Sequence, residues 1–165
     1  MKLGVLSDTH GLLRPEVLPA LEGVDAILHA GDVGDAGILD QLRAIAPVYA
    51  IRGNVDTKGP TASLRPQEAI ELGGHFIYML HSVDQLDIHP KASGITAVVY
   101  GHSHKPLIEY KHGVLFLNPG SCGPRRFSLP VSVAYMYLEP NRPARAEIVH
   151  LAVEADKRQL AYAMG

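Results

Sequence analysis

The chain has 165 residues, a length at which a single domain can bury a substantial core, and its composition is ordinary for a globular protein. The formal net charge is −2 and the basic residues are scattered, so we expect no broad nucleic-acid-binding face. No apolar stretch approaches the roughly 18–20 residues of a membrane span, so we expect no membrane partner. The one cysteine, Cys122, excludes an internal disulfide framework, and the N-terminal run does not resemble a secretory signal. We therefore expect a cytoplasmic protein.

The first half of the chain alternates predicted strands and helices. Apolar segments at 2–6, 25–29 and 48–52 are rich in Val, Ile and Leu, which is typical of buried strands. Helices are expected between them, at about 15–22 and at 36–45. This β-α-β-α-β order predicts a parallel sheet with right-handed crossovers.

The second half contains short apolar or alternating segments, which we expect to be strands. They lie at 69–72, 74–80, 97–100, 107–110, 114–117, 131–138 and 145–151. The pairs Gly73-Gly74 and His112-Gly113 are typical of hairpin turns. A short helix is expected over Ser82–His89, and a terminal helix or tail over 153–165. We predict one domain over residues 1–165, with two packed sheets and helices outside them.

Residues able to bind a metal follow five of the apolar runs. They are Asp8 and His10, Asp32, Asn54, His81, and His102 with His104. Ligands in sheets of this kind lie at the carboxyl ends of strands, so we expect these side chains to gather at one edge. In Asp8-Thr9-His10 and His102-Ser103-His104 the two candidates are two positions apart, which places them on one side of an extended segment. The set as a whole indicates a metal-dependent hydrolase.

The ligand types narrow the choice of metal. Carboxylate, amide and imidazole without thiolate suit Mn, Fe, Zn, Co or Ni and disfavour a structural zinc site. Seven ligands exceed the needs of one ion, but they serve two ions if one carboxylate bridges. Two ions about 3.5–4 Å apart can generate hydroxide and neutralise charge on phosphoryl oxygens. We expect two divalent ions per chain, Mn²⁺ first, with Fe, Ni, Zn or Co as alternatives. A network without a cation would bury carboxylates unpaired at high cost.

Five short blocks of the chain contain these residues. They are Ser7-Asp8-Thr9-His10-Gly11, Gly31-Asp32, Gly53-Asn54, His81-Ser82 and Gly101-His102-Ser103-His104. In order and spacing they resemble the blocks of the calcineurin-like metallophosphoesterases, over residues 2 to about 150. The segment Asn118-Pro119-Gly120-Ser121 and the short length resemble the compact prokaryotic branch, often described as phosphodiesterases, whose fold the eukaryotic retromer subunit shares.

The resemblance implies a fold, a ligand set and an activity. The fold is an α/β four-layer sandwich, with two mixed β-sheets flanked by helices. One ion would take Asp8, His10, Asp32 and His104. The other would take Asp32, Asn54, His81 and His102. Asp32 would bridge the ions together with a hydroxide that attacks phosphorus in line, and the substrate would be a small phosphoester, most simply a phosphodiester. The resemblance to the retromer subunit also allows an alternative, in which this chain is a metal-binding interaction scaffold that catalyses no reaction.

One position departs from the family pattern. Larger members carry a histidine directly after the asparagine of the third block, where it binds phosphate or protonates the leaving group. Here the block reads Gly53-Asn54-Val55-Asp56, and Val55 can do neither. We hypothesise slow turnover and a preference for leaving groups that depart without protonation, because general acid catalysis is typically worth about 10²–10⁴ in rate.

Other polar residues near the blocks have open roles. We expect Asp35 to cap the helix that begins near residue 36 and Asp56 to cap a turn. His29 either supports the ligands from behind or packs as a core residue. Arg125 and Arg126 lie in a Pro-flanked loop, where they are either solvated or, as we note for Arg125 with Asn54, bind the substrate phosphate. Association of the chain into a homo-oligomer is a further open alternative.

Overall fold

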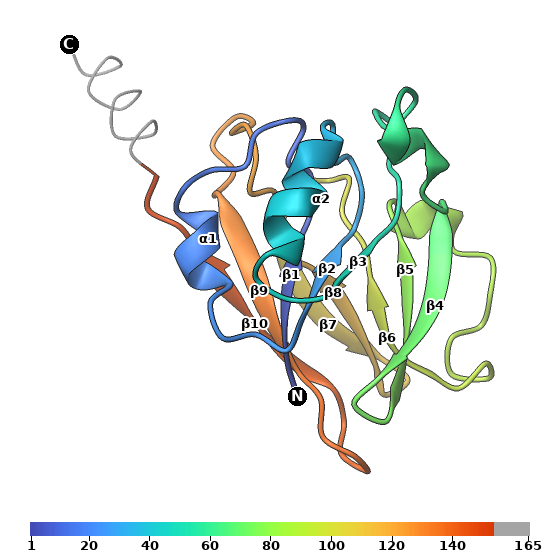
Figure 1. Ribbon diagram of the computed structural model, residues 1–165. Helices are drawn as coiled ribbons and strands as arrows, with labels where there is room; N and C mark the ends of the chain where they lie inside the picture. Colours follow the sequence, from blue (N-terminus) through green and yellow to red (C-terminus); the bar gives the residue numbers. More distant parts are fainter. Residues whose placement is uncertain (154–165) are drawn as a thin grey trace.

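Two five-stranded sheets lie face to face in the computed structural model, which describes residues 1–153 (Figure 1). Sheet 1 has the order β10-β9-β1-β2-β3 and sheet 2 the order β4-β5-β6-β8-β7. The strands of sheet 1 are β1 (Lys2–Leu6), β2 (Ala26–His29), β3 (Val48–Ala50), β9 (Ser132–Tyr137) and β10 (Arg145–His150). Those of sheet 2 are β4 (Gln67–Leu72), β5 (His75–Leu80), β6 (Ile95–Val99), β7 (Leu107–Lys111) and β8 (Val114–Asn118).

The first half of the chain forms the predicted β-α-β-α-β unit. Strands β1, β2 and β3 pair in parallel, and α1 (Val17–Ala20) and α2 (Ala36–Arg43) connect them. The helix expected at about 15–22 has only one turn, and Gly23, whose φ is 79°, turns the chain away shortly after it. Helix α2 begins where expected, because the Asp35 side chain accepts a hydrogen bond from Gly37 N at 2.9 Å.

The second half adds antiparallel strands to both sheets, which makes the sheets mixed. The predicted hairpin turns are present, at Gly73-Gly74 between β4 and β5 and at His112-Gly113 between β7 and β8. All four turn residues have positive φ, as tight two-residue hairpins require. Strands β5, β6 and β8 run in parallel, while β9 and β10 extend sheet 1.

The main core lies between the two sheets. Leu3 and Val5 of β1 face Ile77 and Met79 of β5 in one buried cluster, and alternate residues of β1 face the helices instead. Burying each such side chain stabilises the fold by about 1.5–3 kcal/mol. Leu21, the residue that follows α1, lies so close to β1 that a Cβ on Gly4 would clash with its Cδ2 atom.

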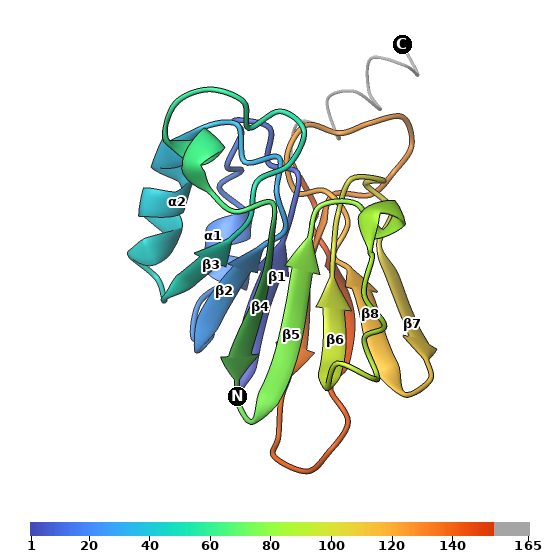
Figure 2. The ribbon, with the colours of Figure 1, turned by 90° about the vertical axis from the view of Figure 1, so that its right-hand side faces the viewer.

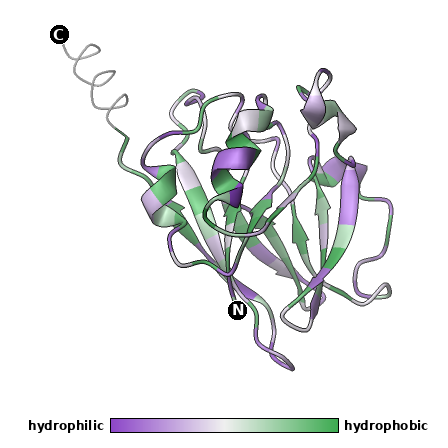
Figure 3. Cartoon of the chain, in the orientation of Figure 1, coloured by the Kyte–Doolittle hydropathy of each residue, from purple (hydrophilic) through white to green (hydrophobic). Residues whose placement is uncertain are grey.

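The two outer faces of the sandwich are covered differently. Helices α1 and α2 lie on the side of sheet 1 away from sheet 2 (Figure 2), and both hydrophobic and hydrophilic residues occur along α2 (Figure 3). Over sheet 2, the helix predicted for Ser82–His89 is wrong, because only the 3₁₀ helix η2 (Val83–Gln85) forms. Leu86 is already extended after it, and Pro90 follows, so the segment packs as an irregular layer. A second 3₁₀ helix, η1, spans Pro60–Ser63.

The arrangement confirms the predicted α/β fold of two mixed sheets, although the outer layer on sheet 2 is not an α-helix. The predicted helix or tail over 153–165 lies outside the described residues except for Val153, which is buried. None of the helices within residues 1–153 combines the length and the apolar character of a membrane span. The loops that follow β1, β2, β3, β5 and β6 all lie at one end of the molecule (Figure 1).

Candidate metal centre

The structure brings the predicted ligand residues together at the carboxyl ends of the strands. Asp8 and His10 follow β1, Asp32 follows β2, Asn54 follows β3, His81 follows β5, and His102 and His104 follow β6. Four aromatic rings from these loops form two neighbouring pairs, because His10 lies 5.3 Å from His104 and His81 lies 5.3 Å from His102, measured between ring centroids. The cluster thus joins loops from both sheets.

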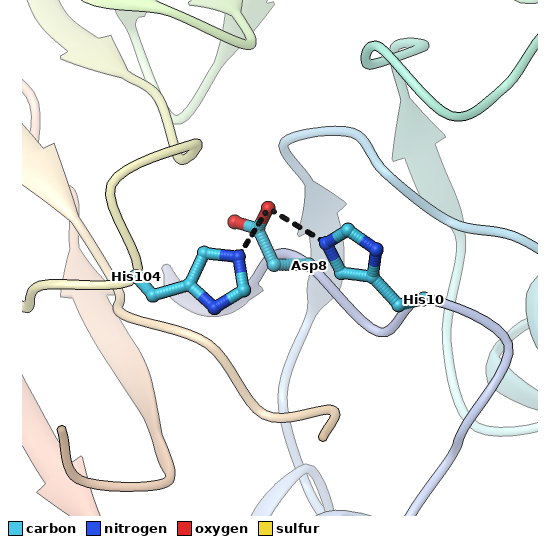
Figure 4. A group of neighbouring side chains, drawn as sticks. All are labelled: Asp8, His10 and His104. Atoms are coloured by element: carbon cyan, nitrogen blue, oxygen red, sulfur yellow. Dashed lines mark ion pairs between the residues drawn. The ribbon is translucent and has the colours of Figure 1, made fainter. Parts of the chain in front are cut away.

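Asp8 lies at the middle of this cluster (Figure 4). Its Oδ1 atom is 3.4 Å from Nε2 of His10, 3.4 Å from Nε2 of His104 and 3.7 Å from Nε2 of His81. The other oxygen, Oδ2, accepts hydrogen bonds from the Ser7 hydroxyl at 2.6 Å and from the His102 backbone N–H at 3.1 Å. The two donors fix the carboxylate so that Oδ1 faces the three imidazoles.

Asp32 lies between the two histidine pairs. Its Oδ2 atom is 3.3 Å from His10 Nε2 and 3.0 Å from His81 Nε2, and its Oδ1 atom accepts a hydrogen bond from the Val55 backbone N–H at 3.0 Å. The family resemblance implied that Asp32 stands between two groups of ligands, and this placement fits that role. The structure adds Asp8 as a second carboxylate that faces histidines of both groups.

Asn54 and His102 lie at the more open side of the cluster. Nδ2 of the Asn54 amide is 3.4 Å from Nδ1 of His102, and both residues are exposed in part. By contrast, Asp8, Asp32, His81 and His104 are buried. The cluster is therefore open to solvent on the side of Asn54 and His102.

Backbone strain concentrates at these residues. Asp8, His10, Asp32, His102 and His104 all have φ between 46° and 72°, the left-handed region that L side chains rarely adopt. Within residues 1–153 only three other non-glycine residues have positive φ. Each such residue costs roughly 1–3 kcal/mol and persists only where the surrounding structure holds it. The prediction that Asp8 and His10 lie on one side of an extended segment is therefore wrong, because both residues have a left-handed backbone.

The donor atoms fit a bound cation. Asp8 Oδ1, His10 Nε2 and His81 Nε2 are buried atoms with no hydrogen-bond partner within the described residues, as is His104 Nδ1. His81 Nδ1 lies 2.8 Å from the Ala30 carbonyl oxygen, so it carries the ring proton and leaves Nε2 free to coordinate. Two ligand atoms at about 2.1 Å from one tetrahedral ion lie roughly 3.4 Å apart, which is the spacing seen around Asp8 Oδ1.

The electrostatics of the cluster keep both carboxylates ionised. Burial alone would raise the pKa of Asp8, but the imidazoles of His10 and His104 and the Ser7 hydroxyl lower it well below its usual value. Burial likewise opposes ionisation of Asp32, and contacts with His81 and the Val55 N–H lower its pKa. The pKa of His10 is raised, chiefly by Asp8. The two carboxylates thus give the cluster a negative charge that a cation would balance.

His29 supports the loops from behind, a role that the sequence left open. The Gly31 backbone N–H donates to His29 Nδ1 at 3.1 Å, so in the neutral ring Nε2 carries the proton and donates to Thr9 Oγ1 at 3.1 Å. Thr9 in turn donates to the Val33 carbonyl oxygen at 2.8 Å. Full burial lowers the pKa of His29 to about 4, so the ring is neutral at pH 7. The chain of contacts joins the Asp8 loop to the Asp32 loop.

The segment Asn118–Ser121 also braces the cluster, which the sequence showed only as a motif. The Asn118 amide donates to the Gly101 carbonyl oxygen at 3.0 Å and to Ser103 Oγ at 3.1 Å. The Ser121 hydroxyl donates to the Asp8 carbonyl oxygen at 3.0 Å. Cys122 is a buried free thiol, and its burial raises its pKa to about 12, so the thiol stays protonated near neutral pH.

Comparisons with known proteins match most of the chain to one protein family. A model of the calcineurin-like phosphoesterase superfamily domain matches residues 1–141. A probable metallophosphoesterase of Methanocaldococcus jannaschii is 36% identical over 130 residues, which cover 73% of this chain and 68% of that protein.

Solved structures share the fold. A structure described as a novel archaeal phosphodiesterase has a TM-score of 0.73 at 24% identity and covers 90% of this chain and 100% of its own. Wild-type Vps29 of Entamoeba histolytica in complex with Zn²⁺ has a TM-score of 0.70 at 23% identity and covers 91% of this chain and 99% of its own. At these identities the likeness concerns the fold alone.

Proposed function

Because the chain belongs to the calcineurin-like phosphoesterase superfamily, we propose that it is a metal-dependent phosphoesterase that hydrolyses phosphodiesters. One observation carries the proposal: the buried Asp8 Oδ1 atom faces Nε2 of His10, His81 and His104 at 3.4–3.7 Å and has no hydrogen-bond partner within residues 1–153. A buried carboxylate oxygen among three imidazole nitrogens is costly without a cation.

The proposed ligand sets follow the two histidine pairs. Asp8, His10, Asp32 and His104 would hold one divalent ion. Asp32, Asn54, His81 and His102 would hold the other. Bound in these two sets, divalent ions would supply hydroxide near neutral pH and positive charge for the phosphoryl oxygens. We propose Mn²⁺ first, with Fe, Ni, Zn or Co as alternatives, because nitrogen and oxygen ligands accept all of these ions.

The chain's own residues orient the ligands and bind the phosphate. The Ser7 hydroxyl and the His102 N–H hold the Asp8 carboxylate, and the Ala30 carbonyl holds the His81 ring. Arg125 and Arg126 lie in the loop between β8 and β9, and the planar guanidinium group of arginine matches the oxygen atoms of a phosphate. We propose that Arg126, Arg125 and Asn54 bind the substrate phosphate.

A scaffold function is the second candidate, and exposed apolar residues at this end favour it. Val55, Leu12 and Phe127 are large apolar side chains that are exposed in the loops around the centre. Vps29, whose name stands for vacuolar protein sorting, shares the fold. The single-domain organisation, the cytoplasmic location and a homo-oligomer stay predictions.

Removal and return of the metal separates the two candidates. We expect protein stripped with a chelator to lose hydrolysis of bis(4-nitrophenyl) phosphate and to regain it after loading with Mn²⁺ or Ni²⁺. The assay is release of 4-nitrophenol, and metal uptake is measured in parallel by elemental analysis. Protein that takes up the metal yet turns over no phosphoester would support the scaffold and overturn the enzyme.

A further inference from the structure

Asp56 is a buried carboxylate that the metal centre does not use directly. It lies two residues after Asn54, and only 3% of its surface is exposed. Three backbone N–H groups donate to it, from Val33 at 3.1 Å, Gly34 at 2.9 Å and Gly53 at 2.9 Å. A carboxylate accepts several such bonds strongly, because its negative charge assists each of them.

The three donors come from the two loops that carry Asp32 and Asn54. Val33 and Gly34 follow Asp32 directly, and Gly53 directly precedes Asn54. Asp56 therefore joins the loop after β2 to the loop after β3 through one side chain. Its own backbone N–H donates to the Gly53 carbonyl oxygen at 3.2 Å, which closes the turn around Asn54.

The two loops are in direct contact at this point. A Cβ on Gly53 would clash with Asp32 Oδ1, and the backbone N–H of Val55 donates to that same oxygen at 3.0 Å. Asp32 holds a φ of 55°, so its strained backbone needs restraint from both sides. The hydrogen bonds to Asp56 are positioned to supply that restraint.

We propose that Asp56 is a positioning residue that sets the distance between the Asp32 carboxylate and the Asn54 amide. The inference rests on the proposed function, since it takes Asp32 and Asn54 to be metal ligands. Partners that orient ligands from behind typically change metal affinity 10–100-fold when they are substituted. A residue that merely stabilised the fold would change the melting temperature and leave the affinity of folded protein unchanged.

The test is the Asp56→Asn variant, with Asp35→Asn as the matched control. An asparagine at 56 has one acceptor oxygen, so its NH₂ group must face at least one of the three N–H donors. Asp35 undergoes the same chemical and charge change three residues after Asp32, but its one side-chain bond caps α2, where asparagine serves equally well. Mn²⁺ affinity is measured by calorimetry on chelator-stripped protein, well below the melting temperature of each variant.

We expect Asp56→Asn to bind Mn²⁺ about 10–100-fold more weakly than wild type, with Asp35→Asn unchanged. Wild-type affinity in folded Asp56→Asn would overturn the positioning role, whatever the activity. Failure of the proposed function would give a different result, because the wild-type protein would then bind Mn²⁺ but hydrolyse no ester.

A measurement on wild-type protein covers the case in which Asp56→Asn does not fold. Hydrogen exchange of the Val33, Gly34 and Gly53 amides in metal-free protein should be slow, because all three donate to a buried carboxylate. Exchange as fast as that of exposed loop amides would overturn the proposal.

Discussion

Replacement of Asp8 by asparagine is expected to remove metal binding and, with it, metal-dependent hydrolysis. Asp8 Oδ2 accepts hydrogen bonds from the Ser7 hydroxyl and the His102 N–H, so the amide oxygen of an asparagine takes that place. Its NH₂ group then replaces Oδ1 and points at Nε2 of the histidines, where it repels a cation. We expect a loss of more than about 100-fold in both metal affinity and turnover, beyond the range for residues that only orient ligands.

The Asp8→Asn variant should still fold. Asparagine has nearly the same volume as aspartate, and it is among the residues that adopt a φ near 59° most readily. Asp25→Asn is the control, since Asp25 accepts a hydrogen bond from Lys2 N in the turn that leads into β2, away from the cluster. Calorimetry with Mn²⁺ and the bis(4-nitrophenyl) phosphate assay measure the effect. Retained turnover in Asp8→Asn, at wild-type metal content, would contradict the proposed centre.

The leaving group of the substrate is expected to have the next largest effect on the rate of hydrolysis. The Val55 side chain is 45% exposed beside Asn54 and has no proton to give, while its backbone N–H is already used by Asp32. Without a general acid, which is typically worth about 10²–10⁴ in rate, alkyl phosphodiesters should be cleaved far more slowly than aryl diesters, whose leaving groups depart without protonation. Val55→His should speed the alkyl esters selectively.

The measurement is a series of diesters whose leaving groups span a range of pKa. We expect a steep dependence of rate on leaving-group pKa for the wild type and a shallower one for Val55→His. Val55→Leu is the control, because it changes the side chain without adding a proton donor. If the wild type cleaves alkyl and aryl diesters equally fast, the hypothesis about Val55 is wrong.

The strands were predictable because burial on both faces leaves continuous apolar runs. Segments 2–6 and 114–117 are such apolar runs, and the structure confirms a strand in each of them. A helix was predicted over Ser82–His89, but its apolar residues Val83, Leu86 and Ile88 pack over sheet 2 from a chain that is irregular after one 3₁₀ turn. Local spacing carries no information about which surface a segment must cover.

The sequence was enough to predict which residues gather at the site, but not their backbone conformation or their hydrogen bonds. Position at strand ends brought Asp32, His81 and the other candidates to one edge, as the parallel order of the strands requires. The left-handed backbone of Asp8 and His10 was not foreseen, because a two-residue spacing suggests an extended chain. Asp56 was expected only to cap a turn, and its bonds to residues 22 and 23 positions earlier depend on the tertiary fold.

Anomalous diffraction from crystals loaded with Mn²⁺ tests the proposed centre most directly. We expect two anomalous peaks per chain, one against Asp8, His10, Asp32 and His104 and the other against Asp32 and His81. Asn54 and His102 should border the second peak. Crystals saturated with Mn²⁺ that show no anomalous peak among these residues would contradict the metal centre and the function proposed from it.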